Sequence, residues 1–255
     1  MKSIKGKTVL ITGASSGIGK AFAFEAAKKG ANLILTARSS QQLNDIATRI
    51  TRQYNNKVQV IVADLSHKED IAKFNGVKTD LLVNNAGIGK WANFLDEASY
   101  EEMLELNINA LVKLTQLVLP GMLERGEGGV INIASTGAFQ PCPYVAVYCA
   151  SKAFVLSFSE ALYGEYYHRG VTVTAVCPGN TATNFQVAAK ADTKGMSVDT
   201  AEYVAQKGLE AFFKGKSYVI TGRVNYLQSF LPRLLPRKSM INVVSGMMKK
   251  RVATN

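Results

Sequence analysis

Tyr148 and Lys152 stand four residues apart, in a stretch whose apolar pattern predicts a helix over 147–168. Residues four apart lie on the same face of a helix, so this spacing places a phenol beside an ammonium group. Free tyrosine has a pKa of about 10, and a neighbouring positive charge lowers it. The pair therefore predicts a residue that exchanges protons near neutral pH, although a surface Tyr–Lys pair would have the same spacing.

A glycine-rich turn lies far upstream of this pair. It follows an apolar stretch at 8–11, which predicts a buried strand, and precedes helical spacing at 20–29. In this context glycines allow close backbone approach, and the N-terminus of the helix attracts a pyrophosphate. A plain tight turn is the alternative. The turn predicts dinucleotide binding by Gly13, Ser15, Ser16, Gly17, Ile18 and Gly19.

The end of the second expected strand bears on the choice of cofactor. An acidic residue that binds the ribose of NAD belongs about 20 residues past the glycine turn. The sequence there, at 36–40, is Thr-Ala-Arg-Ser-Ser and contains no acid. Arg38 suits the 2′-phosphate of NADP instead, with help from Ser39 or Ser40. NADP(H) is therefore favoured over NAD(H), and the alternative is a solvated arginine at a strand end.

Strands and helices alternate along the chain, which is typical of a parallel sheet with helices on both faces. The expected strands lie at 8–11, 32–36, 58–62, 81–83, 129–133, 171–176 and 217–220. The expected helices include 20–29, 41–54, 101–119 (ended by Pro120) and 147–168. This pattern predicts the α/β class, as a single-domain, Rossmann-like, doubly wound parallel sheet of about seven strands. The domain is expected over 1–225, followed by an extension over 226–255.

Composition agrees with a folded domain in a reducing compartment. The 255 residues are 47% hydrophobic and 19% charged, and the three cysteines are too few and irregular for a disulfide framework or a zinc site. No secretory signal and no stretch of about 18 uninterrupted apolar residues is recognisable. No metal site is expected. A cytoplasmic location is expected, with membrane association left open by the C-terminal charge.

The C-terminal extension carries most of the net charge of +11. Nine basic residues and no acid follow Glu210, and Pro232 and Pro236 break any long helix. Beyond them, apolar residues recur at helical spacing from Met240 to Met248, which predicts a basic amphipathic helix. Membrane surfaces, an acidic partner or an acyl-CoA substrate would suit it; packing on the domain or on a second subunit is the alternative. Nucleic acid is not expected, because aromatic residues do not interleave the basic ones.

Taken together, these motifs resemble the classical short-chain dehydrogenase/reductase family. They occur in the family's order and near its spacings over about residues 5–185. The matching residues are Thr12 to Gly19 of the glycine turn, Asp64, Asn84 to Gly87, Asn107, Ser135, Tyr148, Lys152, Pro178, Gly179, Thr181 and Thr183. A weaker similarity points to the ketoacyl and steroid reductase-like subgroup.

The resemblance implies catalytic roles. Tyr148 would be the general acid/base, and Lys152 would lower its pKa and hold the nicotinamide ribose. Ser135 would hydrogen-bond the substrate oxygen, although a turn hydroxyl would fit the same sequence. Asn107, rather than Asn109, would hold a water in the proton relay, although a polar residue satisfied within its own helix is the alternative.

The resemblance also implies contacts to the cofactor. Asp64, with Leu65 beside it, would contact the adenine, although Asp64 is also suited to cap a helix. The turn of Asn85, Ala86 and Gly87 would touch the adenosine ribose. The nicotinamide end would be bound by Pro178, Gly179, Thr181 and Thr183.

Two departures from the family pattern stand out. The segment 64–84 is short, which trims one crossover helix, and Ser16 stands where many NADP-preferring members carry a basic residue. Arg38 would therefore bind the 2′-phosphate largely alone.

The expected activity is NADP(H)-dependent reduction of an apolar ketone or aldehyde, or of a 3-ketoacyl thioester. Residues 184–198 occupy the family's substrate loop, and Phe139, Tyr144, Phe185 and Met196 are candidates for an apolar pocket or for plain core. A homo-oligomer is expected through helices 101–119 and 147–168. The alternative function is an NADP(H)-binding regulator or scaffold that presents its basic tail to a membrane or partner.

Overall fold

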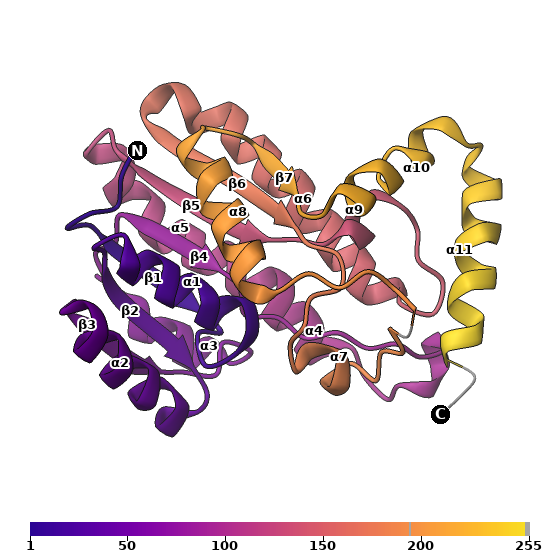
Figure 1. Cartoon of the computed structure of the whole chain (residues 1–255), viewed down its shortest axis with the longest axis horizontal. Coiled ribbons are helices and arrows are strands. Elements are labelled where there is room, and N and C mark those ends of the chain that lie inside the picture. Colours follow the sequence, from indigo (N-terminus) through magenta and orange to yellow (C-terminus); the bar gives the residue numbers. More distant parts are fainter. Residues whose placement is uncertain (194, 253–255) are drawn as a thin grey trace.

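The structure is a computed structural model that describes residues 1–193 and 195–252. A seven-stranded parallel sheet in the order β3-β2-β1-β4-β5-β6-β7 forms its centre (Figure 1). Its strands are β1 (Thr8–Thr12), β2 (Asn32–Ala37), β3 (Val58–Val62), β4 (Leu81–Asn84), β5 (Gly128–Ile133), β6 (Val171–Cys177) and β7 (Tyr218–Ile220). The strand order reverses between β1 and β4, and ligands of such sheets bind at the carboxyl ends of the strands at this point.

Helices cover both faces of the sheet, which confirms the predicted doubly wound architecture. One face carries α1 (Gly17–Lys28), α2 (Ser40–Tyr54) and α8 (Ala201–Phe213), whose apolar sides share a core that includes Phe22 and Phe212. The other face carries α5 (Ala110–Glu124) and α6 (Ala146–Tyr166), with cores built around Phe74 and Val155. Central strands buried on both faces explain the continuous apolar runs in the sequence.

The helix expected over 101–119 differs from the prediction. It runs as α4 (Glu101–Leu104), a π-helical turn η3 (Glu105–Asn109) and α5, and Pro120 lies inside α5. Proline removes one hydrogen bond to the carbonyl four residues back, but Gln116 and Pro120 are both exposed, so water can satisfy that carbonyl. The buried side of α5 carries the helix past the proline, with Val118 and Met122 in the core.

Several short helices complete the domain. The crossover after β3 is reduced to α3 (Lys68–Ile71) and η1 (Ala72–Phe74), as its short sequence predicts. The other single turns are η2 (Phe94–Asp96), η4 (Thr136–Phe139), η5 (Tyr167–Arg169) and α7 (Phe185–Ala188). Within the described chain, helical residues 101–124 alone are long and apolar enough to cross a membrane by length and composition, a test that the core helix of a soluble protein also passes.

The C-terminal segment forms α9 (Arg223–Gln228), α10 (Leu231–Leu234) and α11 (Arg237–Val252). The last of these helices stands at the edge of the molecule, beside the loops at the carboxyl ends of the strands (Figure 1). Met240 and Val244 are buried against Cys142, Val145 and Cys149. One side of the predicted amphipathic helix therefore packs on the domain, whereas its residues Ile241, Val243 and Met247 are exposed.

Candidate active site

Four polar side chains predicted to act in catalysis come together at the carboxyl ends of β4 and β5. Tyr148 and Lys152 lie one turn apart on α6; Lys152 is buried, and Tyr148 is half-buried. Ser135 follows β5, and its hydroxyl accepts a hydrogen bond from the Gly137 amide at 3.1 Å. The elements that hold these groups pack against one another, because α6 contacts both η4 and the π-helical turn η3 (Glu105–Asn109).

Lys152 is a buried cation with one protein acceptor in the described hydrogen bonds. Its Nζ donates to the Ile133 carbonyl oxygen at 2.8 Å and lies 5.8 Å from the centre of the Tyr148 ring. Burial lowers the pKa of Lys152 to about 8. An ammonium group has three donors, so Lys152 retains capacity to hold a further acceptor, such as a ribose hydroxyl.

The pKa of Tyr148 is raised, whereas the sequence predicted that Lys152 would lower it. Burial raises the pKa of the Tyr148 phenol above its ordinary value, and the hydrogen bond with Ser135 opposes this only in part. The physical reason is desolvation of a phenolate in an apolar setting, to which the neighbouring Cys149 and Cys142 add. The consequence is that Tyr148 carries its proton, which is the form required to protonate a substrate oxygen.

Asn107 joins the site from the π-helical turn and is 1% exposed. Its amide nitrogen donates to the Ile88 carbonyl at 2.9 Å and to Ser151 Oγ at 3.1 Å, and its Oδ1 accepts from the Ile88 amide at 2.9 Å. Asn109, in contrast, is exposed and donates to Glu105. Of the two asparagines, Asn107 is therefore the one directed into the site.

Gly87 is the point at which Asn107 and Lys152 meet. A Cβ atom placed on Gly87 would lie 3.0 Å from Asn107 Oδ1 and 3.4 Å from Lys152 Nζ. A side chain here would crowd both groups, which explains why glycine ends the Asn85–Gly87 turn. π-Helical turns are frequent at functional sites, and this one places Asn107 opposite the lysine.

The glycine turn has the backbone that a dinucleotide-binding turn requires, because its glycines adopt conformations and close contacts that a side chain would prevent. Gly13 and Gly17 have φ of +62° and +50°, and a Cβ on Gly19 would lie 2.3 Å from the Gly13 carbonyl oxygen. Ser16 precedes α1 without a side-chain cap in the described contacts, so amide groups of the first turn remain available. Ser15 and Ile18 are half-buried in the same turn.

The turn after β4 is locked to the glycine turn by Thr12 and Asn85. Thr12 Oγ1 accepts from the backbone amides of Asn85 and Ala86, both at 2.9 Å. The Asn85 side chain donates to the Thr12 and Gly13 carbonyls at 2.9 and 3.2 Å. Thr12 was not predicted to be a site residue, although its place as the first residue of the glycine motif was an available signal.

Arg38 and Asp64 lie together at the adenosine end. Arg38 Nη1 is 3.7 Å from Asp64 Oδ2 and 3.5 Å from Glu102 Oε1, and the Arg38 side chain is 65% exposed. Burial alone would raise the pKa of Asp64, but hydrogen bonds from Ser66 and the charge of Arg38 lower it overall. Leu65 is buried beside this pair. A 2′-phosphate at Arg38 would therefore compete with two carboxylates.

The expected nicotinamide-binding segment closes over the glycine turn. A Cβ on Gly17 would lie 2.9 Å from Thr183 Cγ2, and the Pro178 carbonyl accepts from the Thr136 amide at 2.9 Å. Thr181 is buried, and its carbonyl accepts from the Gln186 side chain.

Gly179 of this segment faces a residue from the C-terminal helices. A Cβ on Gly179 would lie 2.4 Å from Asn225 Nδ2, which donates to the Thr221 carbonyl at 2.8 Å. Asn225, on α9, was not anticipated, since no spacing in the sequence links it to this loop.

Aromatic side chains form one wall beside Tyr148. The Phe185 ring centre is 5.5 Å from that of Tyr148, so this pocket candidate lies at the site. Phe139 instead packs into the core with its ring 6.2 Å from Tyr218, and Met196 Sδ accepts from Asn180 at 3.2 Å. Trp91, which no sequence pattern indicated, packs on the cluster next to Tyr148 and binds the Ala189 carbonyl through its amide at 3.1 Å.

The comparisons with known proteins agree with this geometry. The family model described as short chain dehydrogenase matches residues 7–194, about three quarters of the chain. The chain belongs to the short chain dehydrogenase family. It is 41% identical over 196 residues to a very-long-chain 3-oxoacyl-CoA reductase of Anas platyrhynchos, covering 72% of the chain and 63% of that relative. It is 40% identical over 184 residues to a human 17-beta-hydroxysteroid dehydrogenase type 3, covering 68% and 58%.

Both of these relatives are matched over less than two thirds of their own length. A solved structure matches over nearly the whole of both chains. It is a short-chain dehydrogenase from Sphingobium yanoikuyae in complex with NADPH, with a TM-score of 0.82, 29% identity and 98% coverage of each chain. The fold of this short chain dehydrogenase is therefore shared with a family member that has been seen with a bound dinucleotide.

The buried lysine of this short chain dehydrogenase predicts a pH-dependent stability. In the folded state the pKa of Lys152 is lowered to about 8, whereas an unburied lysine has a pKa of 10.5. Below pH 8 both states are charged and folding bears the full desolvation cost, on the order of 3 kcal/mol. Between pH 8 and 10.5 the folded state loses its proton first, so this cost declines and stability rises.

Lys152→Met removes this titration. We expect the difference in melting temperature, variant minus wild type, to fall as the pH rises from 8 to 10.5. Thermal unfolding of both proteins across this range measures it. A difference that stays constant, or that grows with pH, would contradict the assignment of Lys152 as a buried group with a lowered pKa.

Proposed function

We propose that this protein is an NADPH-dependent reductase of an apolar ketone, aldehyde or 3-oxoacyl thioester. The observation that carries the proposal is the meeting of Tyr148, Ser135, Lys152 and Asn107 in a fold whose glycine turn leads from β1 into α1. Bound NADPH would supply the hydride. The rest of the chemistry would belong to groups of the chain itself.

Tyr148 would donate the proton to the substrate oxygen, since its raised pKa keeps the phenol protonated. Ser135, which shares a hydrogen bond with Tyr148, would hold the same oxygen as negative charge develops on it. Lys152 would bind the nicotinamide ribose with the donors that Ile133 leaves free, and its charge would favour the phenolate that remains. Asn107 would keep Lys152 supplied with protons through a water held near Gly87.

The dinucleotide would lie along the glycine turn. Gly13, Ser15, Ser16, Gly17, Ile18 and Gly19 would face the pyrophosphate, with Asp64, Leu65, Asn85, Ala86 and Gly87 along the adenosine and Pro178, Gly179, Thr181 and Thr183 at the nicotinamide. Support comes from the contacts of the glycine turn with Asn85, Ala86 and Thr183, at the switch point of the sheet.

Arg38 would set the preference for NADPH. Its guanidinium is exposed and has only partly satisfied ion pairs at 3.5 and 3.7 Å, so it can turn to a phosphate. We expect Arg38→Ala to raise the Kd of NADPH by about 10-fold to 100-fold and to change the Kd of NADH little. Fluorescence titration with both cofactors measures this, with Arg52→Ala on the exposed side of α2 as the control. Equal weakening of both cofactors would contradict a 2′-phosphate role.

The substrate would be apolar at its carbonyl end because Phe185 lies against Tyr148, and Trp91 and Met248 pack on the same apolar cluster as Tyr148. Two relatives, a very-long-chain 3-oxoacyl-CoA reductase and a 17-beta-hydroxysteroid dehydrogenase, are named for substrates of this kind. Oxidation of NADPH, followed by its absorbance, tests the proposal against apolar ketones and 3-oxoacyl thioesters. Tight NADPH binding without turnover of any of them would favour the alternative, a regulator or scaffold that senses the cofactor.

The C-terminal helices would also contact an anionic membrane surface. The α9–α10 ridge, defined by Leu227, Leu231, Leu234 and Leu235, exposes 39 to 77% of each side chain, and Arg223, Arg233, Arg237 and Lys238 flank it. Exposed apolar groups rimmed by cations are the pattern of interfacial binding. The protein would then be cytoplasmic with a reversible membrane contact.

Flotation with vesicles tests this contact. We expect wild-type protein to float with vesicles that contain anionic lipid but not with neutral ones, and Leu227→Ser with Leu234→Ser to weaken flotation about 10-fold. Leu95→Ser is the matched control, because Leu95 is 88% exposed but lies in η2, outside the ridge. Wild-type protein that fails to float with anionic vesicles would refute the contact.

We further propose a homo-oligomer built through the long helices. Leu104, Leu117 and Phe154 on these helices are 39 to 41% exposed, and Phe154 stacks on Phe158 at 5.7 Å. A second copy would cover this apolar surface. Sedimentation equilibrium of the purified protein decides the matter, and the mass of a single chain at micromolar concentration would contradict it.

A further inference from the structure

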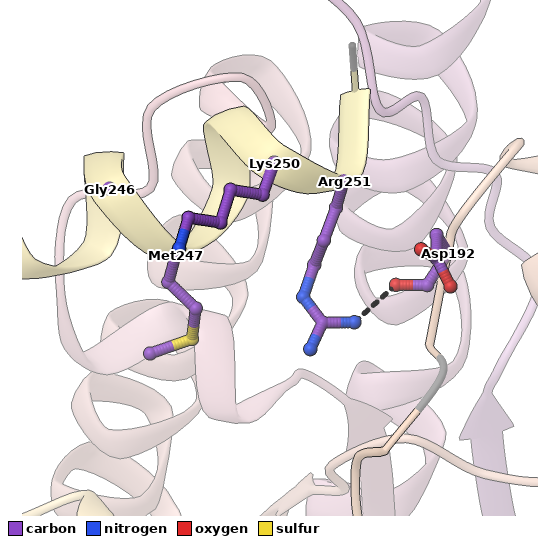
Figure 2. A pocket seen from close by; sticks show the side chains of 5 residues that line it. All are labelled: Asp192, Gly246, Met247, Lys250 and Arg251. Carbon is purple, nitrogen blue, oxygen red and sulfur yellow. Dashed lines mark hydrogen bonds between the residues drawn. The ribbon is translucent and has the colours of Figure 1, made fainter. Parts of the chain in front are cut away.

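A cavity of about 480 Å³ that is open to solvent lies between the end of α11 and the segment that follows α7. It is lined by Asp192, Gly246, Met247, Lys250 and Arg251. Figure 2 shows Met247, Lys250 and Arg251 extending from the last turns of α11, with Asp192 on the neighbouring segment. This volume is in the range of small-molecule sites.

The lining is cationic. Lys250 and Arg251 outnumber the single acid, Asp192, and the chain around them is basic, since nine basic residues and no acid follow Glu210. Arg251 Nη1 donates to the Asp192 main-chain oxygen at 2.6 Å, which ties α11 to the segment opposite and holds the two walls together (Figure 2). A guanidinium and an ammonium group in one cavity suit a phosphate.

Helix α11 runs from this cavity to the neighbourhood of the candidate active site. Met240, Val244 and Met248 are spaced one turn apart on the side of α11 that packs beside Tyr148 and Trp91. Lys250 and Arg251 lie within one further turn, about 5 Å along the helix axis. On the other side, the Ala189 carbonyl, three residues before Asp192, accepts from the Trp91 amide at 3.1 Å, and Trp91 packs on the same cluster as Tyr148. A ligand with its carbonyl at Tyr148 would reach the cavity by lying along α11.

We infer that the cavity binds a phosphate group of a thioester substrate whose acyl end reacts at Tyr148. This inference rests on the proposed function and narrows it to 3-oxoacyl thioesters of phosphopantetheine, carried either by coenzyme A or by a carrier protein. The pantetheine arm separates the thioester from its phosphate, so the phosphate belongs at the rim of the site and not beside the tyrosine. Met247 supplies an apolar contact for the arm.

Three substrates with one acyl group test the inference. They are the coenzyme A thioester, the 4′-phosphopantetheine thioester and the N-acetylcysteamine thioester, which has no phosphate. We expect Lys250→Gln to raise KM about 10-fold for the first two and to leave the third unchanged, with kcat unaltered. Lys249→Gln is the matched control, because Lys249 is exposed on the same helix but does not line the cavity. Arg251→Lys keeps the positive charge and should therefore raise the KM of the two phosphate-bearing thioesters less than Lys250→Gln does.

The outcomes separate cleanly. A KM that rises equally for all three thioesters, or for none, would overturn the inference. A rise for the coenzyme A thioester alone would place the nucleotide phosphates, and not the pantetheine phosphate, in the cavity. If wild-type protein reduces none of the thioesters but does reduce simple ketones, the thioester class fails while the reductase proposal stands. Calorimetric titration with free coenzyme A, at saturating NADP, then decides the cavity alone: equal affinity in wild type and Lys250→Gln would refute it.

Discussion

Tyr148→Phe is expected to lower kcat by about 10² to 10⁴-fold and to leave the Kd of NADPH within about 2-fold of wild type. The phenol hydroxyl is the proton donor, and the change removes that oxygen alone. The ring keeps its contacts with Phe185, whose centre lies 5.5 Å away, and with the neighbouring cluster. Steady-state NADPH oxidation and fluorescence titration give the two numbers.

Tyr163→Phe is the matched control on the same helix. Its hydroxyl donates to the Gly215 carbonyl at 2.9 Å, at the other end of α6 from the site. The loss of one such hydrogen bond costs stability of about 1 kcal/mol and is expected to leave kcat unchanged. Retained turnover in Tyr148→Phe would show that another group supplies the proton and would remove the proposed chemistry.

Gly19→Ala is expected to disrupt the dinucleotide site and to raise the Kd of NADPH by at least about 10-fold. The new methyl group would lie 2.3 Å from the Gly13 carbonyl oxygen and 2.4 Å from Asn85 Nδ2. Neither atom can move away easily, because the first belongs to the backbone and the second donates a hydrogen bond to the Thr12 carbonyl. Overpacking of this kind costs about 1 to 3 kcal/mol of stability, which corresponds to a fall in Tm of roughly 2 to 12 °C.

Gly164→Ala is the control, because it adds the same methyl group at a position away from the glycine turn. Gly164 lies in α6 with no heavy atom near its added Cβ within 4 Å, so alanine there is expected to stabilise the protein by up to about 1 kcal/mol. Thermal unfolding and NADPH titration are compared for the two variants. Normal cofactor affinity in Gly19→Ala would mean that the dinucleotide does not approach the turn.

The architecture was predictable because local signals agree with the global pattern. All seven strands lie within one or two residues of their expected positions, since buried parallel strands are continuous apolar runs bounded by turns. The prediction that a helix ends at Pro120 was wrong, because the low helix propensity of proline describes an isolated helix and not one that packs on a sheet. The burial of Val118 and Met122 on the sheet outweighs the lost hydrogen bond.

The site was only partly predictable. Spacing along one helix pairs Tyr148 with Lys152, but no spacing indicates that Asn107 and Lys152 meet at Gly87, because that contact joins three elements. The acids beside Arg38 were missed for the same reason: Glu102 lies far along the chain and reaches Arg38 only through the fold. The raised pKa of Tyr148 depends on burial, which a sequence pattern does not quantify.

The tail shows the limit of amphipathic patterns most directly. The stripe from Met240 to Met248 predicted an apolar face, but a helical pattern cannot say what covers that face. In the structure Met240 and Val244 are buried on the domain, whereas Val243 and Met247 are exposed. The position of Asn225 against Gly179 likewise depends on how the chain returns to the loops after β7.

Transfer of deuterium from NADPH labelled at C4 of the nicotinamide tests the central claim most directly. The wild-type protein is incubated with an apolar ketone or 3-oxoacyl thioester and each of the two C4-labelled forms of NADPH, and the alcohol is examined by mass spectrometry. One labelled form is expected to place a single deuterium on the carbinol carbon, at a rate that falls by about 10² to 10⁴-fold in Tyr148→Phe. Product without deuterium from either form, or no product from any substrate despite tight NADPH binding, would contradict the account.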